Sequence, residues 1–186
     1  MTKSNEFILI TCNEQKIKEF RLVLLGSGIK FDVLKADKPE LQSDDPCEIV
    51  KVAAKTFAEK IRKAVVIEDS GLFIEALKGF PGTYTKHVYN KIGTAGLIKL
   101  MKGKTDRKCR YKSAVGYCKP GKEPVCFLGS EEGIIAEREK GRKGWGQDPI
   151  FMPKGKNRTY GELRKTESVN TFRKEAIEKL KEFLSS

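Results

Sequence analysis

The stretch that decides the fold is FILITCNEQKIKEFRLVLL, residues 7–25. Residues 7–12 form a short apolar run that ends in a small polar cluster, which predicts a strand followed by a turn. Ile17, Phe20 and Leu24 then recur at the spacing of one helix face. A strand that leads through a turn into a helix is typical of an α/β protein.

The same alternation continues along the chain. Residues 29–34 predict a second strand, and residues 64–67 predict a third. Between them, the segment after Asp44-Asp45-Pro46 has Ile49, Phe57 and Ile61 on one face, which predicts an amphipathic helix. The remaining elements are two short helices, a long hairpin and a final helix: residues 84–92, 95–102, 111–118 with 125–135, and 171–184. We find no repeat or linker, so residues 1–186 are predicted to form a single two-lobed domain.

The composition and the lengths of the apolar runs predict the cellular compartment of the protein. With 39% hydrophobic residues, the 186-residue chain can bury one sizeable core. No run approaches the roughly 18 consecutive apolar residues of a membrane helix, and residues 1–6 lack the apolar segment of a secretory signal. These observations predict a cytosolic protein without a membrane partner.

The cysteines give no sign of a metal site or a disulfide framework. There are five of them, no two are spaced as a zinc pair, and His87 is the only histidine. We therefore expect reduced thiols, buried as small apolar side chains on strands.

The charge is strongly positive. The chain has 37 Lys and Arg against 25 Asp and Glu, a formal net charge of +12. Such a charge attracts nucleic acids, acidic surfaces and triphosphates alike, so it does not choose among them. Solvated helix faces explain many of the lysines equally well.

The turn after the first strand is a candidate phosphate site. Thr11, Asn13 and Lys16 lie where the strand gives way to the helix, so the turn offers backbone N–H groups, the positive end of a helix dipole and a lysine. An ordinary capped helix explains the same residues, and the spacing alone does not decide between the two.

The segment Glu68-Asp69-Ser70-Gly71 places two carboxylates directly after a predicted strand. Their side chains project to opposite faces unless the backbone turns, and Gly71 would permit a turn. Carboxylate oxygens suit Mg²⁺, and one of them could take a proton from water. Glu40 is a candidate third carboxylate; solvated surface charges are the alternative for all three.

A loop near residue 145 is a candidate base site. It contains Trp145, Gly146, Gln147 and Asp148, a set that could stack on a base and hydrogen-bond to its edge. A loop anchored on the core is the alternative. Lys86, shortly after Gly79-Phe80-Pro81-Gly82, could reach a phosphate, although a solvated lysine is the usual case.

Four segments together resemble the inosine triphosphate pyrophosphatase, or HAM1-like, family. They are TCNEQK at 11–16, PE at 39–40, IEDSGLFIEALKGFPGTYTK at 67–86 and GWGQDPIFMP at 144–153. The resemblance covers essentially the whole chain. It implies an elongated mixed α/β sheet joining two lobes, helices on both sides, a nucleotide-binding cleft between the lobes, and a homodimer.

The resemblance also implies roles for individual residues. Thr11, Asn13, Lys16, Ser70 and Lys86 would bind the triphosphate. Glu40 with Glu68 or Asp69 would hold Mg²⁺, with Mn²⁺ as an alternative, and Asp69 would activate water. Trp145, Gly146, Gln147, Asp148 and Arg173 would bind the base.

The chain departs from the family pattern in two places. Gln147 alters the base-binding loop, and before the last helix Thr171 and Phe172 stand where the family has serine and histidine, with Arg173 retained. Lys165 is a candidate for a missing family lysine. Because a site that hydrogen-bonds a group rejects analogues lacking that group, loss of histidine should weaken base discrimination.

Three hypotheses follow from these observations. The first is hydrolysis of inosine and xanthosine triphosphates, including the deoxy forms, to monophosphate and pyrophosphate. The second is the same chemistry with relaxed base choice. The third, of another class, is a nucleotide- or RNA-binding protein without turnover, although nucleic acid is not the expected partner.

Overall fold

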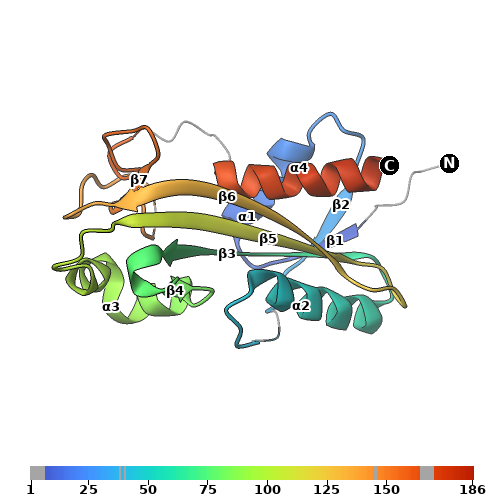
Figure 1. Cartoon of the computed structure of the whole chain (residues 1–186). Helices are drawn as coiled ribbons and strands as arrows, with labels where there is room; N and C mark the ends of the chain where they lie inside the picture. The colour runs from blue at the N-terminus through green and yellow to red at the C-terminus, as the bar shows by residue number, and fades with distance from the viewer. Residues whose placement is uncertain (1–6, 38, 40, 145, 164–169) are drawn as a thin grey trace. The chain divides into compact units, whose positions relative to one another are not determined.

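The computed structural model describes residues 7–37, 39, 41–144, 146–163 and 170–186. Within them the strands form one seven-stranded sheet in the order β2-β1-β3-β5-β6-β7, with β4 paired to β3 (Figure 1). The elements are β1 Phe7–Ile10, α1 Glu14–Leu24, β2 Phe31–Leu34, α2 Pro46–Ile61, β3 Val65–Ile74, a 3₁₀ turn Glu75–Leu77, β4 Pro81–Gly82, α3 Thr85–Leu100, β5 Lys108–Cys118, β6 Val125–Ile135, β7 Phe151–Pro153 and α4 Thr171–Ser185.

The sheet is mixed, as the sequence predicts, and it is open. Strand β1 runs parallel to both β2 and β3, whereas β4 is antiparallel to β3 and β7 is antiparallel to β6. Parallel neighbours need helical crossovers, which α1 and α2 supply, whereas the six-residue connection between β5 and β6 permits only a hairpin.

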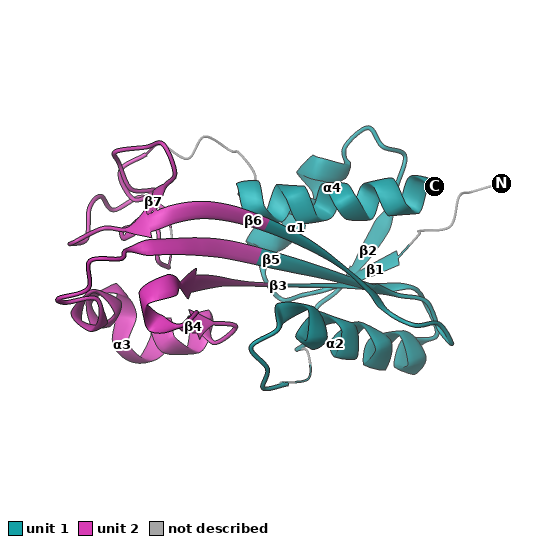
Figure 2. Cartoon of the chain, viewed as in Figure 1, with its two compact units in different colours: residues 1–69, 113–129, 169–186 teal, residues 70–112, 130–168 magenta. Residues whose placement is uncertain are grey.

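The chain divides into two compact units (Figure 2). Unit 1 comprises residues 1–69, 113–129 and 169–186, and unit 2 comprises residues 70–112 and 130–168. Three of the four unit boundaries fall inside β3, β5 and β6. The single two-lobed domain stays a prediction.

In unit 1 helices cover both faces of the sheet. Phe7 and Leu9 of β1 pack with α1 and α4, whereas Ile10 of β1 packs with α2. The same alternation holds in β3, where Val66 faces α1 and α4 while Val65 faces α2. The two-residue period of a strand therefore assigns each side chain in this part of the sheet to one of two helical layers.

Strand β3 corrects one prediction. It does not end at Ile67 but continues through the acidic segment to Ile74. Gly71 does not make a turn; it lies in this strand because a Cβ there would overlap the carbonyl oxygen of Gly82 in β4. The glycine thus permits close approach of a second backbone.

The helical predictions agree with the structure. Helix α2 begins at Pro46, where the Asp45 side chain accepts a hydrogen bond from the Cys47 N–H at 2.8 Å. Two helices were predicted at residues 84–102, and α3 is indeed interrupted at Gly93, whose φ of 61° and ψ of −169° are not helical.

A disulfide contradicts the expectation of five reduced thiols. Cys47 in the first turn of α2 is bonded to Cys126 of β6, with a Cα–Cα distance of 5.7 Å. Both residues pack against the apolar cluster under α2, which brings together positions 79 residues apart in the chain. Of the other three cysteines, Cys109 and Cys118 are buried as expected, but Cys12 is exposed.

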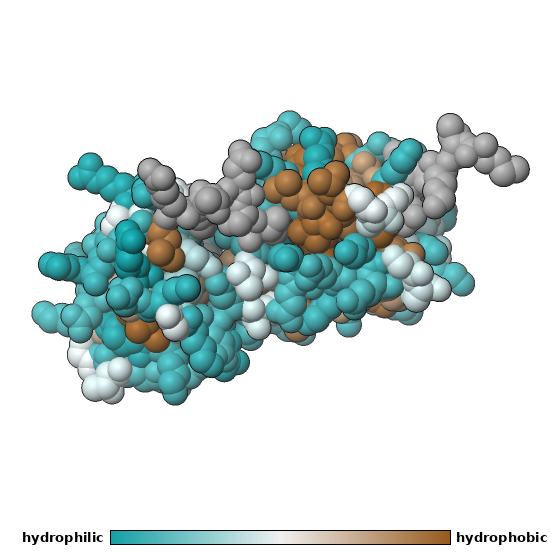
Figure 3. Space-filling view, turned by 90° about the horizontal axis from the view of Figure 1, so that it is seen from above, coloured by the Kyte–Doolittle hydropathy of each residue, from teal (hydrophilic) through white to brown (hydrophobic). Residues whose placement is uncertain are grey.

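The surface is mainly polar on the face seen in Figure 3, with one conspicuous apolar area. Among the described residues, exposed apolar side chains include Leu22 on α1, Leu25 directly after α1 and Phe183 on α4. None of the described helices has the length and apolarity that a membrane crossing requires.

Candidate functional site

The first turn of α1 is capped by Asn13. Its side-chain oxygen accepts hydrogen bonds from the N–H groups of Gln15 at 2.9 Å and Lys16 at 3.2 Å. The Thr11 hydroxyl accepts from the Asn13 N–H at 3.1 Å. Asn13 therefore has the capping role that the sequence left open, and two of the N–H groups that a phosphate could use are already occupied.

The Lys16 side chain meets the acidic segment of β3. Its Nζ lies 2.7 Å from Glu68 Oε2 and donates a hydrogen bond to the Glu68 carbonyl oxygen at 3.0 Å. These two motifs, 52 residues apart, are brought together because β1 and β3 are parallel neighbours and α1 follows β1 directly. The contact is internal, since the Glu68 side chain is 1% exposed.

Glu68 is also held by two residues that lie far away in the sequence. Its Oε1 accepts hydrogen bonds from the Ser113 hydroxyl at 2.6 Å and from Arg173 Nε at 3.0 Å. Ser113 lies on β5, the neighbour of β3, and Arg173 lies in the first turn of α4. A buried carboxylate is thus surrounded by two cations and a hydroxyl.

A second buried carboxylate extends this cluster. Glu19 of α1 is fully buried, and its Oε2 accepts from Arg173 Nη1 at 2.8 Å. Its Oε1 accepts from the side-chain amides of Gln15 and Asn170, both at 2.8 Å. We call the set Lys16, Glu19, Glu68, Ser113 and Arg173 the buried charge cluster. Its two carboxylates and two cations balance, which is what burial of charges requires.

The cluster keeps Glu68 ionised. Burial opposes ionisation, but the charges of Arg173 and Lys16, helped by the hydrogen bonds from Lys16 and Ser113, outweigh it and lower the pKa of Glu68 to about 2. The carboxylates of Glu68 and Glu19 in turn raise the pKa of Arg173, although burial of the guanidinium opposes this. At neutral pH Glu68 and Arg173 are therefore both charged.

Asp69 does not share this environment. Because β3 stays extended, Glu68 and Val66 project toward α1 and α4, whereas Asp69 follows Val65 and Ile67 toward the α2 face. Asp69 is only partly buried. The two adjacent carboxylates that the sequence singles out thus serve opposite faces of the sheet.

Glu68 and Asp69 are not equally suited to hold a divalent cation. Glu68 is engaged by Lys16 and Arg173, which already supply the positive charge that a metal would bring. Asp69 is a partly buried carboxylate, the kind of hard oxygen ligand that Mg²⁺ prefers. Within the described part of the chain no group of three or more His, Cys, Asp and Glu could hold a metal, and Glu40, a predicted ligand, lies outside it.

The candidate base site belongs to unit 2, apart from Arg173. Gln147 and Asp148 are 6% and 3% exposed, and Gln147 Nε2 approaches the Thr85 carbonyl oxygen at 3.5 Å. Gln147 therefore ties the loop to the first residue of α3, and the roles of Gln147 and Asp148 toward a base stay predictions. Gly146 adopts a φ of 57°, and Trp145 lies outside the described residues.

The other predicted residues are placed as follows. Lys86 is exposed in the first turn of α3, and Ser70 is partly buried in β3. Phe172, which stands where the family has histidine, is 5% exposed and packs beside the Arg173 guanidinium at 5.3 Å from its ring centre. Lys165 lies outside the described residues.

Sequence reasoning missed Glu19, Ser113 and Asn170. Glu19 offered a signal, because it lies beside Phe20 on the buried side of α1, where a charged residue needs a partner. Ser113 offered none: only the order of the strands shows that it faces Glu68.

The fold and the buried charge cluster define a class of open mixed-sheet α/β proteins in which the first helix brings a lysine to a carboxylate on the central strand. The chain belongs to the Ham1 family, whose model matches residues 7–183. This membership confirms the resemblance found in the sequence.

Relatives and solved structures agree with the family assignment. A dITP/XTP pyrophosphatase of Methanopyrus kandleri is 43% identical over 177 residues, which is 95% of this chain and 94% of the relative. A dITP/XTP pyrophosphatase of Methanosarcina acetivorans is 40% identical, with 98% of each chain covered. The Staphylococcus aureus Ham1 protein has a TM-score of 0.80 at 26% identity over 96% of this chain and 97% of its own. A HAM1 protein from Coxiella burnetii, similar in fold, has a TM-score of 0.88 at 24% identity over 98% and 99%.

Proposed function

We propose that this protein hydrolyses inosine and xanthosine triphosphates, including the deoxy forms, to the nucleoside monophosphate and pyrophosphate. Two relatives named dITP/XTP pyrophosphatase, at 40% identity or more over nearly the whole chain, support the substrate class. The observation that carries the proposal within the molecule is the contact between Lys16 and Glu68. It holds a cation ready beside the acidic strand, where a triphosphate needs its charge neutralised.

The proposed reaction is attack of water on the α-phosphorus. The water oxygen forms a bond to phosphorus, the bond from phosphorus to the bridging oxygen breaks, and pyrophosphate leaves with that electron pair. Asp69 is the proposed general base, because it is a partly exposed carboxylate that could take the proton from water. Lys16, Thr11, Ser70 and Lys86 are proposed to bind the phosphates.

Glu68 has a different proposed role. With a pKa of about 2 and two cationic partners it accepts no proton near neutral pH, so we propose that it positions Lys16. Asp69, with Glu40, is the proposed holder of Mg²⁺ or Mn²⁺. When bound, such a metal would neutralise charge on the phosphates.

The activity is tested by pyrophosphate release. The purified protein is incubated with Mg²⁺ and ITP, XTP, dITP, ATP or GTP, and pyrophosphate is measured as phosphate after a coupled pyrophosphatase step. We expect release from the first three triphosphates. Absence of release from all five would overturn the proposal.

Two carboxylate variants separate the proposed roles. Asp69→Asn should lower turnover by a factor of about 100 or more, because the amide cannot take a proton. Glu68→Gln should lower both turnover and stability, because it removes the anionic partner of buried Arg173 and of partly buried Lys16. Near-normal turnover in Asp69→Asn would remove the assignment of the general base.

Relaxed base choice is a second candidate. The burial of Phe172 and Gln147 favours it, because neither side chain presents an open hydrogen-bonding group to a base in the way a family histidine would. Comparable kcat/KM on ATP and ITP would support this candidate. A preference for ITP of about 100-fold or more, worth about 2.7 kcal/mol, would contradict it.

We also propose a homodimer and a cytosolic location. Exposed Leu22 on α1 and Leu25 directly after it offer apolar surface for a second copy. Analytical ultracentrifugation over a range of concentrations tests the dimer, and a monomer at all of them would exclude it.

In the cytosol thiol reductants would act on the Cys47–Cys126 disulfide, so thiol alkylation in a fresh lysate shows whether the bond persists there.

A further inference from the structure

The net charge of the chain belongs almost entirely to one unit. The sequence of unit 2 contains 19 Lys and Arg against 9 Asp and Glu, whereas unit 1 contains 18 against 16. Solvated helix faces spread over the whole molecule do not explain such a division. Unit 2 therefore carries a feature that concentrates positive charge.

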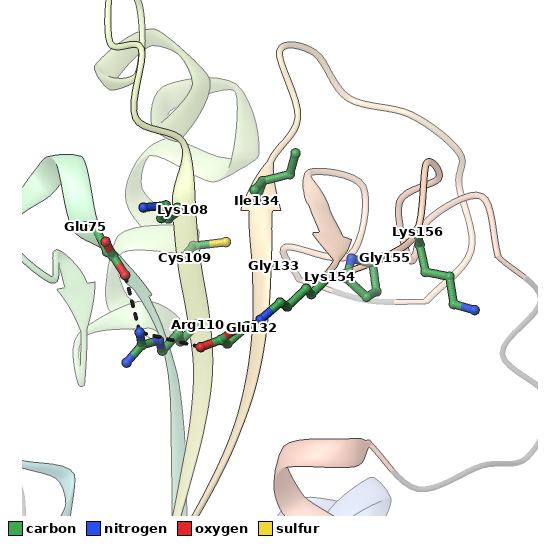
Figure 4. A pocket seen from close by; sticks show the side chains of 11 residues that line it. Glu75, Lys108, Cys109, Arg110, Glu132, Gly133, Ile134, Lys154, Gly155 and Lys156 are labelled. Atoms are coloured by element: carbon green, nitrogen blue, oxygen red, sulfur yellow. Dashed lines mark hydrogen bonds and ion pairs between the residues drawn. The ribbon is translucent and has the colours of Figure 1, made fainter.

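A pocket of about 480 Å³ in unit 2 gathers part of this charge (Figure 4). Its charged lining consists of four cations and two carboxylates: Lys108, Arg110, Lys154, Lys156, Glu75 and Glu132. They come from the start of β5, from β6 and from the turn after β7, with Glu75 from the 3₁₀ turn after β3. None of them belongs to the candidate functional site.

The carboxylates satisfy only part of the positive charge. Glu132 pairs with Lys154 at 2.7 Å, and Arg110 lies 3.6 Å from both Glu75 and Glu132. At 3.6 Å these are ion pairs without hydrogen bonds, so the guanidinium keeps capacity to donate. Glu75 and Glu132 are therefore both already in ion pairs.

Two lysines at the pocket remain available. In the described part of the chain the ammonium groups of Lys108 and Lys156 are paired with no carboxylate, and both side chains are exposed. With four cations against two anions, the pocket has a surplus of two positive charges. An anion entering it would find charge-assisted donors without displacing an existing ion pair.

The pocket offers binding rather than chemistry. Cys109, which also lines it, is held as a neutral thiol, because burial and the nearby Glu75 raise its pKa to about 12 despite Arg107. A thiol with that pKa is a poor nucleophile at neutral pH. None of the described residues that line the pocket is aromatic, so they offer no stacking platform of the kind typical of single-stranded nucleic-acid sites.

We propose that this pocket is a binding site for a small phosphate-bearing anion, separate from the candidate functional site. Its volume is within the range of small-molecule sites, and its unpaired lysines match the charge of a compact polyphosphate. Inorganic pyrophosphate is the simplest member of this class and serves as the probe.

The test compares two pairs of lysine substitutions. Pyrophosphate is titrated calorimetrically into the full-length protein, without divalent metal, at fixed ionic strength. Lys108→Gln/Lys156→Gln removes the two unpaired cations of the pocket, whereas Lys102→Gln/Lys104→Gln removes two exposed lysines of unit 2 that do not line it. Arg110 and Lys154 are left intact because their ion pairs hold the walls of the pocket. Each titration is repeated in a Lys16→Gln background to remove binding at the candidate functional site.

We expect the pocket pair to weaken pyrophosphate binding by about tenfold or more and the control pair by less than about twofold, in both backgrounds. Triphosphate hydrolysis should be unchanged by the pocket pair. Equal weakening by the two pairs would overturn the proposal, since it would show a general charge effect. Loss of all binding in Lys16→Gln alone would also overturn it. So would a pocket pair that weakens binding of a short single-stranded RNA but leaves pyrophosphate binding unaffected.

Discussion

The two units of the molecule differ in their net charge and in how far their charged side chains are buried. Unit 1 is nearly neutral and buries Glu19, Glu68 and Arg173 in a cluster in which each charge has a partner. Unit 2 carries most of the net charge and leaves its ion pairs, such as Lys154–Glu132, in contact with solvent. A buried balanced cluster fixes geometry, whereas an exposed surplus attracts ligands from a distance.

Two glutamates show what this difference means. Both Glu68 and Glu132 are surrounded by cations. For Glu132, whose side chain is 47% exposed, the hydrogen bond and charge of Lys154, followed by the charge of Arg110, lower the pKa of the carboxylate. For Glu68 the cations also have to overcome burial. Only the buried glutamate should contribute strongly to folding stability, because water and salt screen the exposed one.

The largest effect should come from Arg173→Met. The substitution keeps most of the side-chain volume but leaves Glu19 and Glu68 without their shared cation, and breaking a buried ion pair in this way costs about 3–5 kcal/mol. Urea unfolding at neutral pH measures the loss. Arg110→Met in unit 2 is the matched control, because Arg110 also contacts two carboxylates but is 48% exposed.

The control should lose at most about 1 kcal/mol. Equal losses in the two arginine variants would break the comparison between the units. The same Arg173 variant, assayed on ITP under conditions where it remains folded, shows in addition whether the cluster supports turnover.

Periodic segments could be predicted from the sequence, and segments defined by a tertiary neighbour could not. The strand at residues 7–10, helix α1 and helix α4 follow from apolar spacing alone. The continuation of β3 through Glu68 and Gly71 did not, because a polar segment with a glycine is typical of a turn. Only β4, which packs against Gly71, explains why the strand continues. The Cys47–Cys126 bond could not be predicted either, because it depends on the tertiary contact between α2 and β6.

The candidate site shows the same limit. Lys16 and Glu68 were found because each lies in a recognisable motif, and the structure brings them into contact. The sequence could not show which residues hold Glu68, since Ser113 and Arg173 come from a strand and a helix whose positions depend on the order of the sheet. It also could not show that Asp69 faces the other way, because that follows from β3 remaining extended.

An intermediate effect is expected for Ser113→Ala. Loss of the 2.6 Å hydrogen bond to Glu68 should lower stability at neutral pH by about 1–2 kcal/mol. The variant should also raise the pKa of Glu68 from its value of about 2. A lowered pKa stabilises the fold above the ordinary value of 4.5, and that stabilisation disappears as the pH falls from 4.5 toward 2.

The acid-dependent part of the stability should therefore be smaller in Ser113→Ala than in the unmodified protein. Urea unfolding at a series of pH values between 7 and about 2 measures it. Ser185→Ala, at the exposed end of α4, serves as the control and should follow the unmodified curve. A Ser113→Ala curve parallel to the unmodified one would show that the hydroxyl does not influence ionisation of Glu68.

The smallest effect should come from Lys154→Met in unit 2. Lys154 and Glu132 are only 2.7 Å apart, as close as Lys16 and Glu68, but their side chains are 78% and 47% exposed. Because solvent screens the pair, we expect a loss of less than about 1 kcal/mol in urea unfolding, which shrinks further in about 1 M salt. The Lys16–Glu68 contact, shielded by burial, should keep its contribution in that salt, as Lys16→Met would show. If Lys154→Met proved as costly as Lys16→Met and equally insensitive to salt, distance rather than burial would govern these ion pairs, and the contrast between the two units would lose its physical basis.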